Sequence, residues 1–231
     1  MSGRIFAVGL GPGAPEAMTV EAAAVLERCH AVVGYTGYVE LLDPELLAGR
    51  TVVATGMRGE VERCRRAVAL AAEGADVAVV CSGDAGVYAM AGLLLEVLEA
   101  EGLEQDVGFE AVPGVPAFVA AAALLGAPLM HDFAAVSLSD LLTPWEAIAR
   151  RVEAAAGADF VLAVYNPRSR RRTGHLAEAL EIIARHRRPH TPVGVVKNAR
   201  REGQQVRVTT LAGLDVDQVD MQIGRASCRE R

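Results

Sequence analysis

The chain has 231 residues, which is enough for one large domain or for two domains of ordinary size, each with its own core. Apolar residues make up 52% of the sequence and aromatic residues 4%, a usage typical of a compact α/β protein. The formal net charge of −6 argues against nucleic acid as the main partner, because binding a phosphate backbone usually needs a basic face.

Apolar runs of strand length alternate along the chain with longer stretches whose apolar residues recur at helical spacing. Strands that helices bury on both faces read as continuous apolar runs, as these do. The predicted fold class is therefore α/β, with a doubly wound, mostly parallel sheet in the first half. The predicted strands are residues 5–8, 31–33, 51–53, 77–80, 109–112, 134–138, 160–164, 193–196 and 206–209. The predicted helices are residues 20–28, 60–73, 89–101, 117–125, 145–156 and 176–185.

Two helix starts can be predicted at the level of single residues. Thr19 is expected to cap the first helix, because a Thr side chain readily accepts a hydrogen bond from the first helical turn. The helix that follows Thr143 is expected to have Pro144 as its first residue and Glu146 in its first turn.

The predicted domain boundary is the segment in which Pro113 and Pro116 flank Gly114, since such a segment forms an extended elbow. We predict an N-terminal α/β domain at residues 1–113 and a C-terminal α/β domain at residues 114–222, with a mixed sheet and helices. The last residues are polar and basic where a final apolar strand is expected, so residues 223–231 are interpreted as a non-native or disordered tail.

A loop of glycine and proline, residues 9–15 (GLGPGAP), directly follows the first predicted strand. Such a loop lets backbone N–H groups come close to a small ligand. It loosely fits the dinucleotide fingerprint, but Pro12 and Pro15 delay the helix that should follow at once. The next strand ends in Gly34-Tyr35 and offers no carboxylate for a ribose. The loop therefore predicts a nucleotide-like ligand other than NAD.

Asp84 lies between Gly83 and Gly86, shortly after the predicted strand 77–80. Its carboxylate is placed to accept hydrogen bonds from an amine or a ribose of a ligand. The alternative is a helix N-cap for residues 87–100, a role that Asp often has. Together with the preceding glycine loop, the position favours the ligand.

A basic cluster, residues 165–172 (YNPRSRRR), follows another predicted strand. Asn166-Pro167 forces a turn, so the arginines are expected at a helix start, where they oppose the helix dipole. That unfavourable placement indicates an anionic ligand such as a carboxylate, and the alternative is a solvated charged loop. Residues 197–204 (KNARREGQ) form a second basic cluster, at the end of a later predicted strand.

Other polar and aromatic side chains give weaker indications. His131 precedes Asp132, a pair found more often in a turn than as a catalytic dyad. Ser139 and Asp140 lie where the predicted strand 134–138 ends. Tyr35 either contacts an aromatic ligand or lies at the edge of the hydrophobic core.

Cysteine usage and hydropathy predict a soluble, cytoplasmic protein without a metal site of its own. The four cysteines are scattered without a C-x-x-C pair, which indicates neither a zinc site nor a disulfide framework. The longest apolar stretch, residues 118–125, is too short to cross a bilayer, and no signal peptide is evident. We therefore expect no membrane partner and no nucleic-acid partner.

Several segments taken together resemble the tetrapyrrole methylase family. They are residues 9–13 (GLGPG), 82–84 (SGD), 113–117 (PGVPA) and the loop that begins with Lys197-Asn198, and the resemblance covers residues 4 to about 222. Independent segments must match in the right order, so the combination is far more specific than one glycine loop. Residues 33–35, 137–145 and 165–169 further resemble the family members that methylate C-17 of precorrin-3B.

The resemblance implies S-adenosylmethionine bound in a kinked conformation in a cleft between two α/β domains, and a homodimer. Relatives often have Ser or Thr where this chain has Pro116, so a hydrogen bond expected there must come from the backbone or be lost. The residues implied by position to line the cofactor are Gly11, Pro12, Ser82, Gly83, Asp84, Val87, Pro116, Ala117, Asn166 and Ala199.

The reaction implied by the resemblance is methyl transfer to C-17 of precorrin-3B or of cobalt-factor III, coupled to ring contraction, in cobalamin biosynthesis. Methyl transfer depends mainly on positioning. Ring contraction needs removal of a proton from a hydroxyl, or activation of a carboxylate. The candidates for this acid–base role are Asp140, His131 and Ser139. The candidates for binding the tetrapyrrole and its carboxylates are Tyr35, Arg168 and Lys197.

Two other functions fit parts of the sequence. One is a methyltransferase of the same fold with an RNA or protein acceptor, although the net acidity disfavours RNA. The other is a nonenzymatic cofactor-binding protein, if the unusual end of the chain disables the fold. The choice between a metal-free and a cobalt-containing substrate is left open by the sequence.

Overall fold

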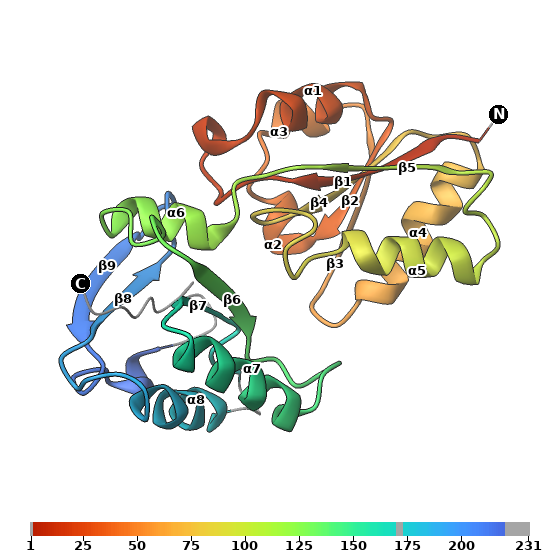
Figure 1. The fold of residues 1–231 in the computed structure, drawn as a ribbon. Helices are drawn as coiled ribbons and strands as arrows, with labels where there is room; N and C mark the ends of the chain where they lie inside the picture. The colour runs from red at the N-terminus through yellow and green to blue at the C-terminus, as the bar shows by residue number, and fades with distance from the viewer. Residues whose placement is uncertain (1, 170–172, 220–231) are drawn as a thin grey trace. The chain divides into compact units, whose positions relative to one another are not determined.

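The computed structural model describes residues 2–169 and 173–219. The chain divides into two compact units, unit 1 at residues 1–117 and unit 2 at residues 118–231 (Figure 1). The predicted tail, residues 223–231, lies outside the described residues. None of the helices among the described residues is long and apolar enough to cross a membrane.

Unit 1 contains a five-stranded sheet whose neighbouring strands all run parallel. Its order is β3-β2-β4-β1-β5, so β1 and β4 lie side by side at its centre. The prediction of a parallel sheet in the first half is confirmed. The strands are β1 (Arg4–Gly9), β2 (Ala31–Tyr35), β3 (Thr51–Thr55), β4 (Val77–Cys81) and β5 (Gly108–Val112).

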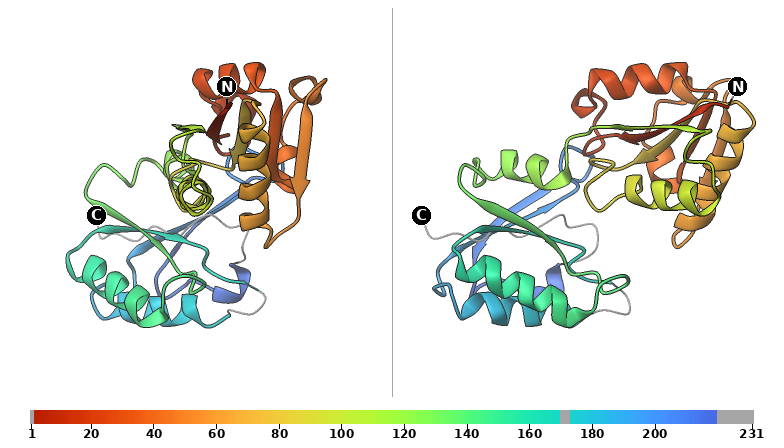
Figure 2. Two further views of the ribbon diagram at one scale, coloured as in Figure 1. Left: turned by 90° about the vertical axis from the view of Figure 1, so that its right-hand side faces the viewer. Right: turned by 45° about the vertical axis from the view of Figure 1, so that its right-hand side comes forward.

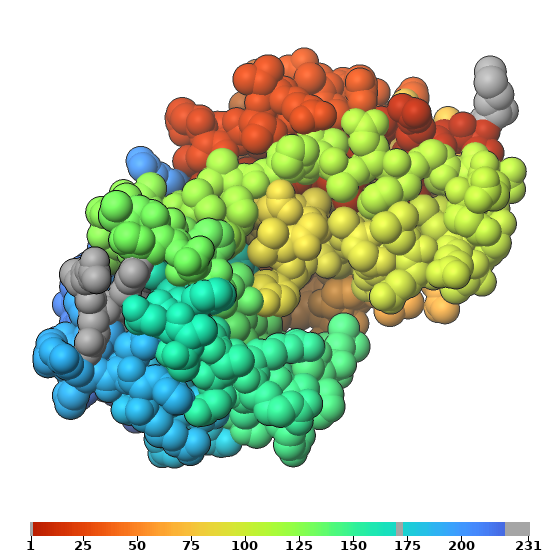
Figure 3. All heavy atoms as spheres, in the orientation of Figure 1, coloured from red at the N-terminus to blue at the C-terminus, as the bar shows by residue number. Residues whose placement is uncertain are grey.

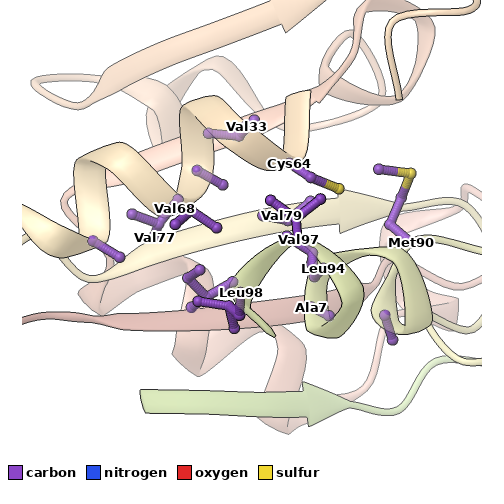
Figure 4. Close-up of a cluster of buried hydrophobic side chains, with 14 of the residues drawn as sticks. Ala7, Val33, Cys64, Val68, Val77, Val79, Met90, Leu94, Val97 and Leu98 are labelled. Carbon is purple, nitrogen blue, oxygen red and sulfur yellow. The ribbon is translucent and has the colours of Figure 1, made fainter. Parts of the chain in front are cut away.

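Helices cover both faces of this sheet, as the right-hand view of Figure 2 shows. On one face, α4 (Glu60–Ala72) and α5 (Ala91–Ala100) pack against alternate residues of the central strands (Figure 4). On the other face, α1 (Val20–Arg28) packs against Phe6 and Val8 of β1 and Val80 of β4. Figure 3 shows that the segment from α5 to β5, coloured yellow to green, forms much of the surface of unit 1 on the face in view. The sheet is therefore doubly wound, as predicted.

Unit 2 contains both parallel and antiparallel strand pairs. The described strands form one parallel pair, β6 (Phe133–Ser137) with β7 (Val161–Tyr165), and one antiparallel pair, β8 (Pro192–Lys197) with β9 (Gln205–Thr210). A second core lies between these strands and two amphipathic helices. The helical elements of this unit are α6 (Ala117–Leu124), α7 (Trp145–Gly157), α8 (His175–Ala184) and the 3-10 helix η2 (Val216–Gln218).

Of three predicted helix starts, the structure confirms one and differs from two. The Thr19 side chain accepts a hydrogen bond from the backbone N–H of Ala22, which confirms the predicted cap of α1. Pro144 is the N-cap residue of α7, and not its first helical residue as predicted. Helix α5 begins at Ala91, two residues later than predicted, after Tyr88 has taken a positive φ of 52°. A residue in this conformation interrupts a helix.

Three short helical elements of unit 1 were not predicted from the sequence. One or two turns are too few for apolar residues to show a helical period, so the pattern carries no signal there. These elements are the 3-10 helix η1 (Pro15–Ala17), α2 (Thr36–Val39) and α3 (Pro44–Leu47).

Arg63 on α4 is a buried cation, with 4% of its surface exposed. Its guanidinium donates to the Thr55 hydroxyl (Nε, 2.8 Å) and to the Gly56 carbonyl (Nη2, 3.1 Å), and its Nη1 lies 3.8 Å from the Met90 sulfur. Within the described part of the chain it forms no ion pair with a carboxylate. The guanidinium therefore ties the turn after β3 to the residue that precedes α5.

We expect Arg63→Ala to lower the free energy of unfolding by about 3 kcal/mol, since hydrogen bonds to a charged donor contribute strongly and the Thr55 and Gly56 acceptors lose their partner. Arg65→Ala on the same helix is the matched control. Arg65 is exposed and lies 3.7 Å from Glu101, and an exposed ion pair of this kind contributes at most about 1 kcal/mol. Urea unfolding followed by circular dichroism measures both. Equal stability of the two variants would contradict the structural role of Arg63.

Candidate functional site

The carboxyl ends of the parallel strands in unit 1 place several loops at one edge of the sheet. Strands β1 and β4 are neighbours, and the helices that follow them, α1 and α5, lie on opposite faces. In an open α/β sheet, the point where successive helices change face is where ligands bind. The loops after β1 and β4 are therefore the first place to look for a site.

The loops after β1 and β4 are joined through their backbones. Leu10 donates its N–H to the Cys81 carbonyl (2.8 Å), which continues the strand ladder past the end of β1. Gly11 and Gly83 then exchange two hydrogen bonds, of 3.0 Å and 2.7 Å, as an isolated antiparallel bridge. The two glycine-containing loops are thus held at a fixed distance from one another.

The loop after β5 packs against the same two segments so closely that a side chain does not fit. A Cβ atom on Gly114 would lie 2.2 Å from the carbonyl oxygen of Gly83 and 2.6 Å from that of Gly9. A Cβ atom on Gly9 would lie 2.7 Å from the Gly114 nitrogen. Gly11 has a φ of +71°, a conformation that glycine adopts without steric cost. Three loops therefore meet backbone to backbone, and glycine is required where they touch.

Asp84 joins the second and third of these loops. Its Oδ2 accepts a hydrogen bond from the N–H of Gly114 (3.0 Å), and its Oδ1 accepts one from the N–H of Gly86 (2.8 Å). The alternative prediction, that Asp84 caps the following helix, is wrong because that helix begins at Ala91 and has no side-chain cap. A carboxylate has about four acceptor positions, so Asp84 can still accept hydrogen bonds from a ligand.

The other residues implied to line a cofactor fall in both units. Pro116 and Ala117 lie against Gly83, whose ideal Cβ position is 3.7 Å from the Pro116 Cα and 3.4 Å from the Ala117 nitrogen. Pro12 and Ser82 adjoin the Gly11–Gly83 bridge in sequence, and Val87 belongs to the loop of Asp84. The two residues in unit 2 are Asn166, directly after β7, and Ala199, two residues after β8.

Cys81 at the end of β4 is a structural residue. Its thiol is buried next to the Gly11–Gly83 bridge, and burial raises its pKa to about 11. A thiol with so high a pKa is protonated at neutral pH and is a poor nucleophile. The chemistry of this site therefore does not involve Cys81.

In unit 2, the ends of β6 and β7 are connected by side chains. Asn166 has a positive φ of 50°, and its Nδ2 donates to the hydroxyl oxygen of Ser137 (3.0 Å). The same oxygen accepts the N–H of Ser139 at 3.2 Å. Ser139 therefore contributes its backbone to a network that fixes the first residues after β6.

The structure places Arg168 differently from the sequence prediction. Helix α8 begins at His175, so Arg168 does not stand at a helix start and does not oppose a helix dipole. Its Nη1 instead lies 2.9 Å from the Asp217 carboxylate and 3.3 Å from the Val216 carbonyl, both in η2. Residues 170–172 of the predicted basic cluster lie outside the described residues.

The remaining predicted substrate and catalytic residues are dispersed. Tyr35 packs edge-on against Tyr38, with ring centroids 5.1 Å apart, and Lys197 is the half-buried last residue of β8. His131 and Asp132 are exposed, and neither side chain forms a hydrogen bond or ion pair with any other described residue. Asp140, by contrast, lies with its Oδ2 3.8 Å from the Nε2 of His175.

His175 is the one residue of this region that the sequence analysis missed. The helical period indicates a helix from residue 176, which places His175 just outside it in the sequence prediction, whereas it is the first residue of α8. Its partners are thirty or more residues away along the chain, so no local pattern reveals them. Among the described residues, no group of three or more His, Cys, Asp or Glu side chains could hold a metal ion.

Residues 4–215 match the family model for tetrapyrrole (corrin/porphyrin) methylases. The chain belongs to the tetrapyrrole methylase family. The resemblance inferred from the glycine loops and the segments around Asp84 and Pro113 is thereby confirmed.

Two curated relatives of this methylase cover most of its length. It is 50% identical to a probable cobalt-factor III C(17)-methyltransferase of Salmonella typhimurium, over 93% of this chain and 88% of the relative. It is 39% identical to a precorrin-3B C(17)-methyltransferase of a Sinorhizobium species, over 96% of this chain and 87% of the relative. A cobalt-factor III methyltransferase of Priestia megaterium is 48% identical, but the chain spans only 39% of that longer protein.

Solved structures of family members have the same fold. The methyltransferase CobJ superposes with a TM-score of 0.93 at 38% identity, over 99% of this chain and 95% of CobJ. Uroporphyrin-III C-methyl transferase from Thermus thermophilus, complexed with S-adenosyl homocysteine, superposes with a TM-score of 0.71 at 25% identity, over 97% of this chain and 92% of that one. These matches cover the strands and loops of both units of this methylase.

We expect Gly114→Ala to weaken binding of S-adenosylhomocysteine by about 100-fold or more, which is about 2.7 kcal/mol. The new methyl group would overlap the carbonyl oxygens of Gly83 and Gly9, so the three loops must separate. Gly92→Ala is the matched control, because a Cβ atom there meets nothing within 4 Å on the exposed side of α5. Isothermal titration calorimetry measures the affinity, and thermal unfolding reports the fold. Wild-type affinity in Gly114→Ala would contradict the glycine requirement.

Proposed function

We propose that this chain is an S-adenosylmethionine-dependent methyltransferase that methylates C-17 of cobalt-factor III or precorrin-3B, coupled to ring contraction, in cobalamin biosynthesis. The observation that carries the proposal is the agreement of both comparisons over nearly the whole chain. The two relatives named as C(17)-methyltransferases match more than 90% of the chain, and CobJ has the same fold at a TM-score of 0.93. This support favours a tetrapyrrole acceptor over an RNA or protein acceptor, and an enzyme over a nonenzymatic binding protein.

The loops of unit 1 fit the methyl donor. A sulfonium donor supplies an electrophilic methyl group when it is bound there. The Gly11–Gly83 bridge uses the N–H and carbonyl groups of both glycines and so fixes the two loops, and the Asp84 carboxylate keeps acceptor positions after its two backbone bonds. Pro116 and Ala117 lie against Gly83 and complete the group in this unit. We propose that these residues bind the methyl donor, together with Pro12, Ser82, Val87, Asn166 and Ala199.

Methyl transfer to an electron-rich ring carbon depends on alignment more than on acid–base assistance. Positioning alone can account for about 7–11 kcal/mol of a barrier when the reacting groups are held in line. The rigid backbone pairing of Gly11 with Gly83 suits this requirement, since the loops do not have to reorganise during the reaction. The contribution of unit 1 is therefore orientation.

Ring contraction, in contrast, requires a base. Asp140 is the best placed of the three candidates, because its side chain is about half exposed and a histidine lies behind it. Asp140 would take a proton from a substrate hydroxyl, and the electron pair of the O–H bond would stay on the substrate oxygen. Ser139 is engaged through its backbone, and the exposed His131 has no described partner to orient it.

Arg168 and Lys197 would bind the acetate and propionate groups of the tetrapyrrole. The contacts of Arg168 with Asp217 and Val216 both use Nη1. A guanidinium has five N–H donors, so Arg168 can bind a further carboxylate while η2 holds it in place. Tyr35 remains a candidate for contact with the flat macrocycle.

The identity values favour the cobalt-containing substrate. The relative named for cobalt-factor III is 50% identical to this chain and the one named for precorrin-3B is 39% identical. The cobalt ion in this reaction belongs to the substrate. We further propose a cytoplasmic homodimer, as the family resemblance implies.

Mass spectrometry of a reaction with S-adenosylmethionine and each tetrapyrrole tests the activity. We expect a gain of one methyl group and a contracted ring, faster on cobalt-factor III than on precorrin-3B. A heat-inactivated sample and a reaction without the donor are the controls. Binding of S-adenosylhomocysteine without methylation of either tetrapyrrole would exclude the proposed acceptors.

Arg168→Ala tests the substrate role of that residue. We expect the Michaelis constant for the tetrapyrrole to rise about tenfold or more, because a charge-assisted hydrogen bond to a carboxylate is lost. The affinity for S-adenosylhomocysteine should stay unchanged. Asp217→Asn is the matched control, since it removes the same internal ion pair and keeps the guanidinium. If Asp217→Asn raises the Michaelis constant as much as Arg168→Ala does, then Arg168 acts through its bond to η2 and not through the substrate.

A further inference from the structure

The segment between β6 and α7, residues 138–144, extends away from the body of unit 2 and is here called the β6–α7 segment (Figures 1 and 3). Leu141 and Leu142 within it are 84% and 93% exposed, so packing does not fix its middle. Leu138 at its start is fully buried and donates its N–H to the Tyr165 carbonyl (2.9 Å). The position of Asp140 therefore depends on contacts between this segment and side chains from other elements of unit 2.

His175 contacts this segment and the residue that follows it. Its Nδ1 lies 3.2 Å from the Leu138 carbonyl oxygen, and its ring stacks on Trp145, with centroids 4.2 Å apart and planes 15° apart. Its Nε2 lies 3.8 Å from the Oδ2 of Asp140. The His175 side chain is only 15% exposed, whereas that of Asp140 is 49% exposed. One largely covered imidazole thus contacts both ends of the segment and lies next to its carboxylate.

These contacts determine which ring nitrogen can exchange a proton. A carbonyl oxygen only accepts hydrogen bonds, so the Nδ1 of His175 must carry a hydrogen to bond Leu138. The Nε2, which lies 3.8 Å from the Oδ2 of Asp140, is then left with a lone pair. At 3.8 Å the carboxylate and a protonated ring attract each other as an ion pair.

We propose that His175 positions Asp140 and receives the proton that Asp140 removes from the substrate during ring contraction. The inference rests on the proposed function. The O–H bond of a substrate hydroxyl breaks and its electron pair stays on the substrate oxygen. The proton passes to the Asp140 carboxylate and then, once the 3.8 Å separation between Oδ2 and Nε2 closes to hydrogen-bond length, to the Nε2 of His175. The resulting imidazolium is balanced by the regenerated carboxylate of Asp140.

A second histidine–carboxylate pair in unit 2 provides a comparison. The Nε2 of His186, just after the end of α8, lies 2.6 Å from the Oε1 of Glu153 on α7. This pair is more exposed than His175 and has no contact with the β6–α7 segment or with Trp145 among the described residues. It serves as a control for the loss of a histidine–carboxylate pair that has no catalytic role.

Two substitutions separate the bond to Leu138 from the interaction with Asp140. In His175→Asn the amide nitrogen replaces Nδ1 and keeps the bond to the Leu138 carbonyl, but nothing replaces Nε2. In His175→Gln the amide nitrogen reaches toward the place of Nε2 but cannot take a proton at neutral pH. Trp145 is the only tryptophan of the chain, so its fluorescence reports on the stack with residue 175 directly.

The experiment measures methyl transfer and ring contraction separately, by mass spectrometry and absorption spectroscopy, in the wild type, both His175 variants, Asp140→Asn, the Asp140→Asn/His175→Asn double variant and His186→Asn. We expect both His175 variants to keep methyl transfer within about threefold and to slow contraction about 100-fold, the size typical of a lost acid–base group. The double variant should contract no more slowly than Asp140→Asn alone, since His175 acts through Asp140. His186→Asn should retain both rates.

Three outcomes would overturn the inference while leaving the proposed function intact. They are wild-type contraction in His175→Asn and His175→Gln, an equal loss of methyl transfer and contraction in both, and an additive double variant. A wild-type protein that methylates neither tetrapyrrole would overturn the proposed function, and this inference with it. Thermal unfolding and Trp145 fluorescence identify any variant that has lost its fold, and the other His175 variant then decides.

Discussion

The backbone contact among the loops that follow β1, β4 and β5 is the constraint on which unit 1 depends. Gly114 lies so close to the carbonyl oxygens of Gly83 and Gly9 that even a methyl group would overlap them. Asp84 accepts the N–H of Gly114 and so keeps the third loop in contact with the second. Because these loops extend from strands of one parallel sheet, the order β4-β1-β5 is what brings them together. The strand order therefore also determines which loops form the proposed donor site.

The two units hold their functional groups by different means. Unit 1 joins its first two loops by the main-chain hydrogen bonds of the Gly11–Gly83 bridge and adds one side chain, Asp84, to hold the third loop. Unit 2 uses side chains, with Ser137 bonded to Asn166 and His175 bonded to the Leu138 carbonyl. A reaction that needs alignment suits the first arrangement, and a reaction that moves protons suits the second.

The sequence predicts the parts of this structure that depend on neighbouring residues. Central strands such as β1 and β4 were predictable because buried parallel strands read as apolar runs, and the cap at Thr19 because its partner Ala22 is three residues away. The roles of Asp84, Arg168 and His175 were not predictable in the same way. Their partners Gly114, Asp217 and Leu138 are 30, 49 and 37 residues distant in sequence, and only the folded chain brings them together.

The resemblance and the proposed role of His175 involve the same segment of unit 2. Residues 137–145 are one of the segments that narrowed the resemblance from the family to its C-17 methylating members. The same segment carries Asp140 and ends at Trp145, both of which contact His175. Methyl transfer alone does not call for a carboxylate–imidazole pair, whereas ring contraction does call for a proton acceptor. The proposed Asp140–His175 pair would therefore supply in unit 2 what separates ring contraction from simple methylation.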